Sequence, residues 1–155
     1  MHPEPGLFRA ILEGWSRQSG TAPGKAPVTL LDEQGPRALV GADLLALASR
    51  CAAGLSQLGV RNGDRVGLAL PTGEAFLGTF FGAWSLGATA VPLAPLAPRQ
   101  DAAHESARLA RPFAAVGAKV VVATPQAAEL LQDEGLTAIA VDLEPGKPFP
   151  ATAGP

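Results

Sequence analysis

Glycine-containing turns are the first features of this 155-residue sequence that could do chemistry, because turns leading into helix N-termini can bind phosphate. Residues 20–26 (GTAPGKA) have one residue too few between their glycines for a P-loop, and Lys25 is not followed by Ser or Thr. Residues 70–74 (LPTGE) join a predicted strand to a predicted helix but contain one glycine. We therefore predict that Thr72 caps this helix and that neither turn binds a nucleotide.

The other groups that could act in catalysis or bind a metal are scattered. Cys51 is the single cysteine and lies in a helical pattern, which predicts a buried, unreactive thiol. The two histidines, His2 and His104, have no spacing that suggests a zinc site or a Cys-His pair. The carboxylates form no patterned pair in an apolar setting that would raise a pKa for acid-base work. The sequence thus predicts no catalytic, cofactor-binding or metal-ligating residue.

The composition narrows the possible partners. The net charge is −2, the twelve Lys and Arg residues are dispersed, and 5% of residues are aromatic with no Tyr, so we expect no nucleic-acid partner. Charged residues make up 17% of the chain, against about 25% in typical soluble domains. We therefore expect one domain core with some apolar surface that meets a partner or further chain.

One uncharged stretch, residues 75–98, imitates a membrane span and contains the GxxxG spacing of Gly78 and Gly82. Three prolines near its end would break a spanning helix, so we predict no membrane span. A helix that ends near Gly87, followed by a short strand, explains the stretch, with the two glycines letting the helix approach a sheet closely. The N-terminus lacks the basic and apolar regions of a secretory signal, which predicts a cytoplasmic location.

The elements that would position any site follow from apolar periodicity. The first part of the chain predicts a helix at 7–15, a loop at 19–27, a β-hairpin from 27–33 and 38–40, and a helix at 43–58 capped by Gly59. Predicted strands follow at 65–70, 89–93, 119–123 and 137–141, alternating with helices at 74–86, 103–116 and 125–133. Thr124 is the predicted N-cap of the last helix, with Pro125 at its first position.

This alternation is typical of an α/β fold. We predict a partial, mostly parallel sheet with right-handed βαβ crossovers, preceded by an N-terminal helix and the β-hairpin. The expected division is an N-terminal helix and loop at residues 1–26, an incomplete α/β subdomain at 27–142, and a Pro/Gly-rich exit linker at 143–155.

Two separated motifs carry a family resemblance. Residues 38–44 (ALVGADL), and then 50–95 (RCAAGLSQLGVRNGDRVGLALPTGEAFLGTFFGAWSLGATAVPLAP), resemble the opening of the adenylate-forming, AMP-binding superfamily. The specific feature is GDRV at 63–66, placed about twenty residues before LGATAVPL at 86–93. Gly41 and Asp43 replace an aromatic residue and Glu of the first motif. The segment 80–84 (FFGAW) resembles the fatty acyl-AMP ligases and acyl-CoA synthetases of this superfamily.

The resemblance implies half of the N-terminal domain of an adenylate-forming enzyme. The complete enzyme would use ATP and Mg²⁺ to convert a carboxylic acid, here a fatty acid, to acyl-AMP and pyrophosphate, with CoA or an acyl carrier protein as the thiol acceptor. The family's phosphate loop and catalytic Lys have no counterpart here, so we expect the chain to be inactive alone.

Two alternatives stay open. The first is a non-catalytic truncated or split α/β module that pairs with the remainder of the adenylating domain, or with itself through an exposed sheet edge. The second is an independent nucleotide-binding domain, which would need a glycine-rich phosphate turn that the sequence does not offer.

Overall fold

The computed structural model describes residues 10–11, 13–14, 17, 28–32, 35–39, 41–94 and 102–141. Residues 10–11 and 13–14 are helical, and the rest of the predicted helix at 7–15 lies outside the described residues. The predicted loop at 19–27 and the predicted linker at 143–155 lie outside them as well.

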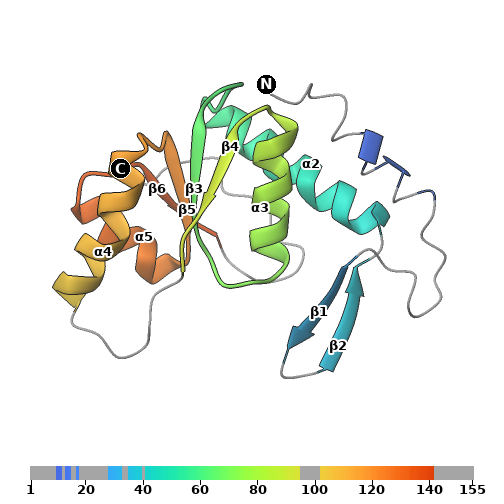
Figure 1. Cartoon of the computed structure of the whole chain (residues 1–155), viewed down its shortest axis with the longest axis horizontal. Coiled ribbons are helices and arrows are strands. Elements are labelled where there is room, and N and C mark those ends of the chain that lie inside the picture. Colours follow the sequence, from blue (N-terminus) through green and yellow to red (C-terminus); the bar gives the residue numbers. More distant parts are fainter. Residues whose placement is uncertain are drawn as a thin grey trace.

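A four-stranded parallel sheet organises the described part of the chain (Figure 1). Its strands are β3 (Arg65–Ala69), β4 (Thr89–Pro92), β5 (Val120–Ala123) and β6 (Ala138–Ala140), in the order β4-β3-β5-β6. The helices α3 (Glu74–Ser85), α4 (Ala102–Ala115) and α5 (Pro125–Asp133) connect successive strands. The predicted α/β fold with a parallel sheet is therefore confirmed. The helices are needed because two parallel strands can be joined only by a long crossover connection.

The predicted hairpin forms from β1 (Val28–Asp32) and β2 (Gly35–Leu39), which pair antiparallel. Its second strand begins at Gly35, earlier than the predicted position 38, because the antiparallel register extends to the pair of Asp32 and Gly35. Figure 1 shows the hairpin set apart from the sheet, next to the start of α2 (Gly41–Gln57).

Apolar side chains fill both faces of the sheet, since successive residues of a strand point to opposite sides. In β5, Val120 and Val122 belong to one buried cluster, and Val121 and Ala123 belong to the other. Helices α2 and α3 cover the first face, whereas α4 and α5 cover the second (Figure 1). Both faces of the central strands are therefore buried, as parallel sheets require.

Helix α3 packs closely against α2, which corrects the predicted role of its glycines. A methyl group added at Gly82 would lie 2.8 Å from the Ala52 backbone nitrogen and 3.0 Å from the Ala48 carbonyl oxygen, and both atoms belong to α2. A methyl group at Gly78 would lie 2.6 Å from Leu47 Cγ, again in α2. The GxxxG spacing thus lets two helices approach each other and not, as predicted, a helix and the sheet.

The two predicted helix caps have different outcomes. Thr124 caps α5 as predicted, since its hydroxyl oxygen accepts a hydrogen bond from the Ala127 backbone nitrogen at 3.4 Å, with Pro125 at the first turn. Thr72 does not cap α3. A helix capped by Thr72 would begin at Gly73, whereas α3 begins at Glu74. Its N-cap is Gly73, without a side-chain hydrogen bond. Glu74, in the first turn, supplies the favourable negative charge instead.

Among the described residues, no helix combines the length and apolar character needed to cross a membrane.

Candidate functional site

The carboxyl end of the parallel sheet is where open α/β folds bind ligands, so it is the first candidate site. Three of the polar side chains described at this end make contacts that hold the fold. Arg37 of the hairpin pairs with Glu74 at the start of α3, and Thr124 caps α5. Within the described part of the chain, no group of three His, Cys, Asp or Glu residues could hold a metal ion.

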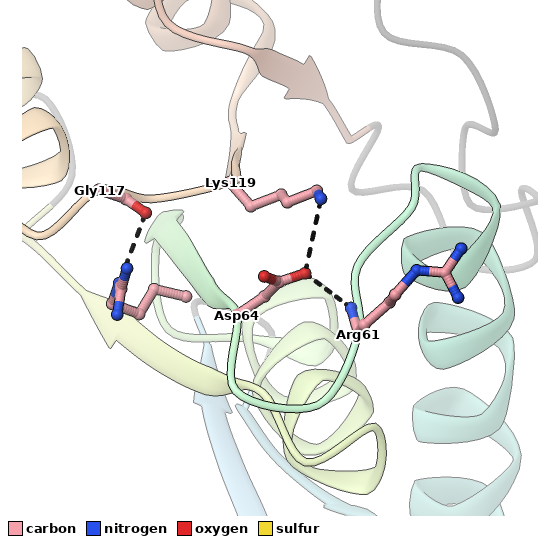
Figure 2. A network of polar contacts seen from close by, with 5 residues as sticks. Arg61, Asp64, Gly117 and Lys119 are labelled. Atoms are coloured by element: carbon pink, nitrogen blue, oxygen red, sulfur yellow. Dashed lines mark hydrogen bonds and ion pairs between the residues drawn. The ribbon is translucent and has the colours of Figure 1, made fainter.

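The amino end of the sheet carries a polar network around Asp64 (Figure 2). The Asp64 carboxylate accepts a hydrogen bond from the Arg61 backbone nitrogen at 2.8 Å and lies 3.7 Å from Lys119 Nζ. Arg65 Nε donates to the Gly117 carbonyl oxygen at 3.5 Å. The network therefore joins the turn before β3 to the turn before β5. It lies at the end of the sheet opposite the usual ligand position, and the contacts that it makes connect the two turns.

The two motifs that carry the family resemblance contact each other directly. The Gly63 backbone nitrogen donates to the Gly87 carbonyl oxygen at 3.0 Å, and the Thr89 nitrogen donates to the Asp64 carbonyl oxygen at 2.8 Å. Gly87 has a φ of +73°, and a side chain there would collide with Asn62. The motifs at 63–66 and 86–93 therefore form one structural unit at the amino end of β3 and β4, as expected for turn and packing residues.

Cys51 is buried, as predicted, and its sulfur lies on the side of α2 that faces Gly78 of α3. Burial raises the pKa of its thiol to about 11, while the Thr79 hydroxyl and the Arg50 charge lower it by less. The thiol is therefore protonated at neutral pH, and the thiolate that a nucleophile or metal ligand requires is not formed.

The remaining candidates from the sequence are not brought together. His104 lies in α4, whereas His2 and the glycine-containing turn at 20–26 lie outside the described residues. Sequence reasoning missed the Asp64 network, because the two contacts that link its turns join residues more than fifty positions apart. The GDRV motif was the signal that could have indicated it.

Comparison with known proteins agrees with the resemblance that the two motifs carry. A family profile described as AMP-binding enzyme matches residues 16–153. Long-chain-fatty-acid–CoA ligase FadD13 from Mycobacterium tuberculosis is 50% identical over 52 residues, which cover 34% of this chain and 10% of FadD13. Pyochelin synthase PchD from Pseudomonas aeruginosa is 42% identical over 93 residues, which cover 58% of this chain and 17% of PchD.

A solved structure also matches most of the chain. The N-terminal domain of FACL13 from Mycobacterium tuberculosis superposes with a TM-score of 0.58 and 28% sequence identity. The match covers 81% of this chain and 29% of that domain. The chain spans between 10 and 17% of the length of the two curated relatives, and less than a third of the solved domain.

Proposed function

Because the chain belongs to the AMP-binding enzyme family, we propose that it is the N-terminal part of a ligase that activates a carboxylic acid with ATP. In the proposed reaction the acid carboxylate attacks the α-phosphorus of ATP, forms acyl-AMP and releases pyrophosphate. A thiol of CoA or an acyl carrier protein then takes the acyl group and releases AMP. FadD13 joins long-chain fatty acids to CoA, which supports a fatty acid as the substrate class.

The observation that carries this proposal is the contact between the two motifs at 63–66 and 86–93. These residues lie within the matched profile and build the amino end of β3 and β4 through backbone hydrogen bonds. Their role is therefore to shape the sheet on which the rest of an adenylating domain is built. The family's chemistry would then depend on residues elsewhere in that domain.

The described residues act as scaffold in this proposal. They offer no set of side chains that fits Mg²⁺, and we assign no step through ATP or the metal to them. The Cys51 thiol is protonated, and Glu74 is held by Arg37 at the carboxyl end of the sheet. The proposed division is a subdomain at 27–142, with a helix and loop before it and a linker after it. ATP as substrate supports a cytoplasmic location.

Pyrophosphate exchange tests the proposal. We expect the purified 155-residue chain to show no palmitate-dependent exchange between ATP and labelled pyrophosphate. A FadD13 variant that carries this chain's residues in the matched 52-residue segment should retain exchange, because the segment is 50% identical in the two proteins. Exchange by the chain alone would contradict the scaffold role. A folded chimera without exchange would contradict the assignment to fatty acid ligases.

A second candidate function is a non-catalytic module that associates with a partner fragment. The exposed apolar side chain of Trp84 on α3 favours it, since such a side chain suits a contact with another polypeptide. Pyrophosphate exchange by the FadD13 chimera distinguishes the two candidate functions. The ligase assignment predicts that the chimera retains exchange, whereas the non-catalytic module makes no such prediction.

A further inference from the structure

Asn62 is the single asparagine of the sequence, and it is followed by Gly63. An asparagine before glycine is prone to lose ammonia spontaneously, because glycine has no side chain to hinder ring closure. The Gly63 backbone nitrogen gives its proton to solvent and attacks Asn62 Cγ, and the bond from Cγ to the side-chain nitrogen breaks as that nitrogen leaves as ammonia. Water then opens the succinimide ring to aspartate or isoaspartate. The pair is therefore a reactive site that the proposed ligase function does not use.

The turn that carries this pair lies between Arg61 and Asp64 (Figure 2). The Asp64 backbone nitrogen donates to the Arg61 carbonyl oxygen at 3.1 Å, and the Arg61 nitrogen donates to the Asp64 carboxylate at 2.8 Å. Gly63 has a φ of +84° and Asn62 does not have a positive φ, which is the arrangement of a type II turn. Asn62 and Gly63 thus occupy the two central positions, and both are exposed to solvent.

The attacking nitrogen is held by Gly87. The Gly63 backbone nitrogen donates to the Gly87 carbonyl oxygen at 3.0 Å. Ring closure needs this nitrogen to lose its proton and to turn toward Asn62 Cγ, and both changes break the hydrogen bond. The turn must therefore open before the reaction starts, as a hydrogen-bonded amide must before its proton exchanges with solvent.

The side chain under attack is held by the same residue. A methyl group added at Gly87 would lie 2.4 Å from Asn62 Oδ1 and 3.0 Å from Asn62 Cγ, so the carboxamide packs directly on the Gly87 backbone. The space exists because position 87 is a glycine, which also adopts its φ of +73° without strain. One residue therefore restrains both groups that would react.

We propose that Asn62 and Gly63 are a deamidation site that Gly87 keeps unreactive in the folded chain, and that isoaspartate forms there when the contact between the two motifs opens. This chemistry is independent of the proposed ligase function. Ammonia is lost, so the change is not reversed when the turn closes again.

Isoaspartate also prevents the native turn from closing. Its main chain runs through the former side-chain Cβ and Cγ, which lengthens the backbone by one atom between Asn62 Cα and the Gly63 nitrogen. That nitrogen can then no longer meet the Gly87 carbonyl oxygen while Asp64 closes the turn on Arg61. The modified chain therefore keeps a record of each opening that led to reaction.

The first test compares the folded chain with the same chain unfolded in guanidinium chloride, at one temperature and one mildly alkaline pH. Mass spectrometry of the peptide that contains residue 62 measures deamidation, and labelling by an isoaspartyl methyltransferase measures isoaspartate. We expect isoaspartate to form at least about tenfold faster in the unfolded chain, because the native contacts must open first. Equal rates would overturn the proposal.

Two matched variants test the role of Gly87. Gly87→Ala displaces the Asn62 side chain, whereas Gly117→Ala places alanine at a φ of +62° in the turn before β5, where it meets the Arg65 side chain at 3.4 Å. Both variants strain a turn at the amino end of the sheet, but only the first touches the reactive pair. We expect Gly87→Ala to speed deamidation of the folded chain by about tenfold and Gly117→Ala to leave the rate unchanged.

Equal acceleration by the two variants would contradict the role of Gly87 and assign protection to the stability of the whole fold. Circular dichroism verifies that each variant is folded, and the comparison of the folded and unfolded unchanged chain depends on neither of them.

The last measurement isolates the lengthened main chain. Asn62→Asp introduces the same negative charge with a normal backbone, so it is the control for the purified isoaspartate form. We expect the isoaspartate form to unfold at a lower denaturant concentration than Asn62→Asp. Equal midpoints would contradict the claim that isoaspartate prevents the turn from closing.

Discussion

The two sides of the parallel sheet are built in opposite ways. On the α4 and α5 side, large residues such as Leu109, Phe113 and Leu131 are fully buried, and charged residues such as Arg111 and Glu129 lie outside. On the α3 side, the fully buried residues are small, the phenylalanines are half-buried against the core clusters, and Trp84 is exposed. The first arrangement resembles a finished domain surface, whereas the second has the pattern of an internal layer. The two sides thus differ in the size of the side chains that are fully buried against the sheet.

Truncating an aromatic residue on each side should give the largest contrast. Phe113 is fully buried and its ring fills the space left by Gly67, where an added methyl group would lie 2.7 Å from it. We expect Phe113→Ala to lower the free energy of unfolding by about 3 to 5 kcal/mol in urea titrations. Phe80→Ala, on the half-buried face, should cost less than half as much. Equal losses would remove the distinction between the two sides.

The contact between α2 and α3 gives the next effect. Gly82→Ala should destabilise by roughly 2 kcal/mol, because the added methyl group meets backbone atoms of α2 that cannot move independently. Gly78→Ala is the matched control, since the atoms it meets are side-chain atoms of Leu47 and Cys51. In thermal unfolding, the melting temperature of Gly78→Ala should lie closer to that of the unchanged chain than the melting temperature of Gly82→Ala does. The reverse order would contradict the close packing of the two helices.

Alkaline pH probes the same interface through Cys51. Its folded pKa of about 11 exceeds the ordinary value of 9.0, so the unfolded chain releases its thiol proton first as the pH rises. The contribution of the protonated thiol to the free energy of unfolding is complete below pH 9 and is lost as the pH rises from 9 to 11. The loss in the free energy of unfolding is about 1.4 kcal/mol by pH 10.

The Cys51→Ala variant should lose this part of the pH dependence, although it starts from a lower stability. Unfolding titrations at pH 8 and pH 10 on both proteins provide the check. An identical decline in the two would show that the thiol is not buried between the helices.

The smallest effects are expected in the Asp64 network, which joins the turns before β3 and β5. Asp64→Ala removes the acceptor for the Arg61 backbone nitrogen and should cost about 1 kcal/mol. Lys119→Ala removes a partly exposed ion pair and should cost less than about 0.5 kcal/mol, and still less at high salt. A larger effect for Lys119→Ala would indicate that the ion pair, and not the hydrogen bond, holds the turns together.

Much of the fold could be predicted because the signals are local. Apolar periodicity and turn residues located α2, β3, α3 and β5 to within a few residues, and Thr124 before Pro125 identified a cap. Contacts across the fold were not predictable in this way. The spacing of Gly78 and Gly82 indicated a close approach but not its partner, which proved to be α2.

The candidate site was predictable only in part, for the same reason. Strand order decides which turns meet, and no local pattern states that the turn before β5 lies next to Asp64. Likewise, the periodicity of α3 is uninformative, because a helix that is apolar all round has no single buried face to detect. Its inverted burial could be seen only once α2 and the sheet were in place.

The most direct test of the contrast between the two sides is the binding of the dye 8-anilinonaphthalene-1-sulfonate to the purified chain at neutral pH. The dye fluoresces on exposed apolar surface, so the chain should bind it and Trp84→Lys should abolish most of the signal. Val116→Lys should leave the signal unchanged. No dye binding by the unchanged chain, or an equal loss in the two variants, would contradict the difference in exposed apolar surface between the two sides of the sheet.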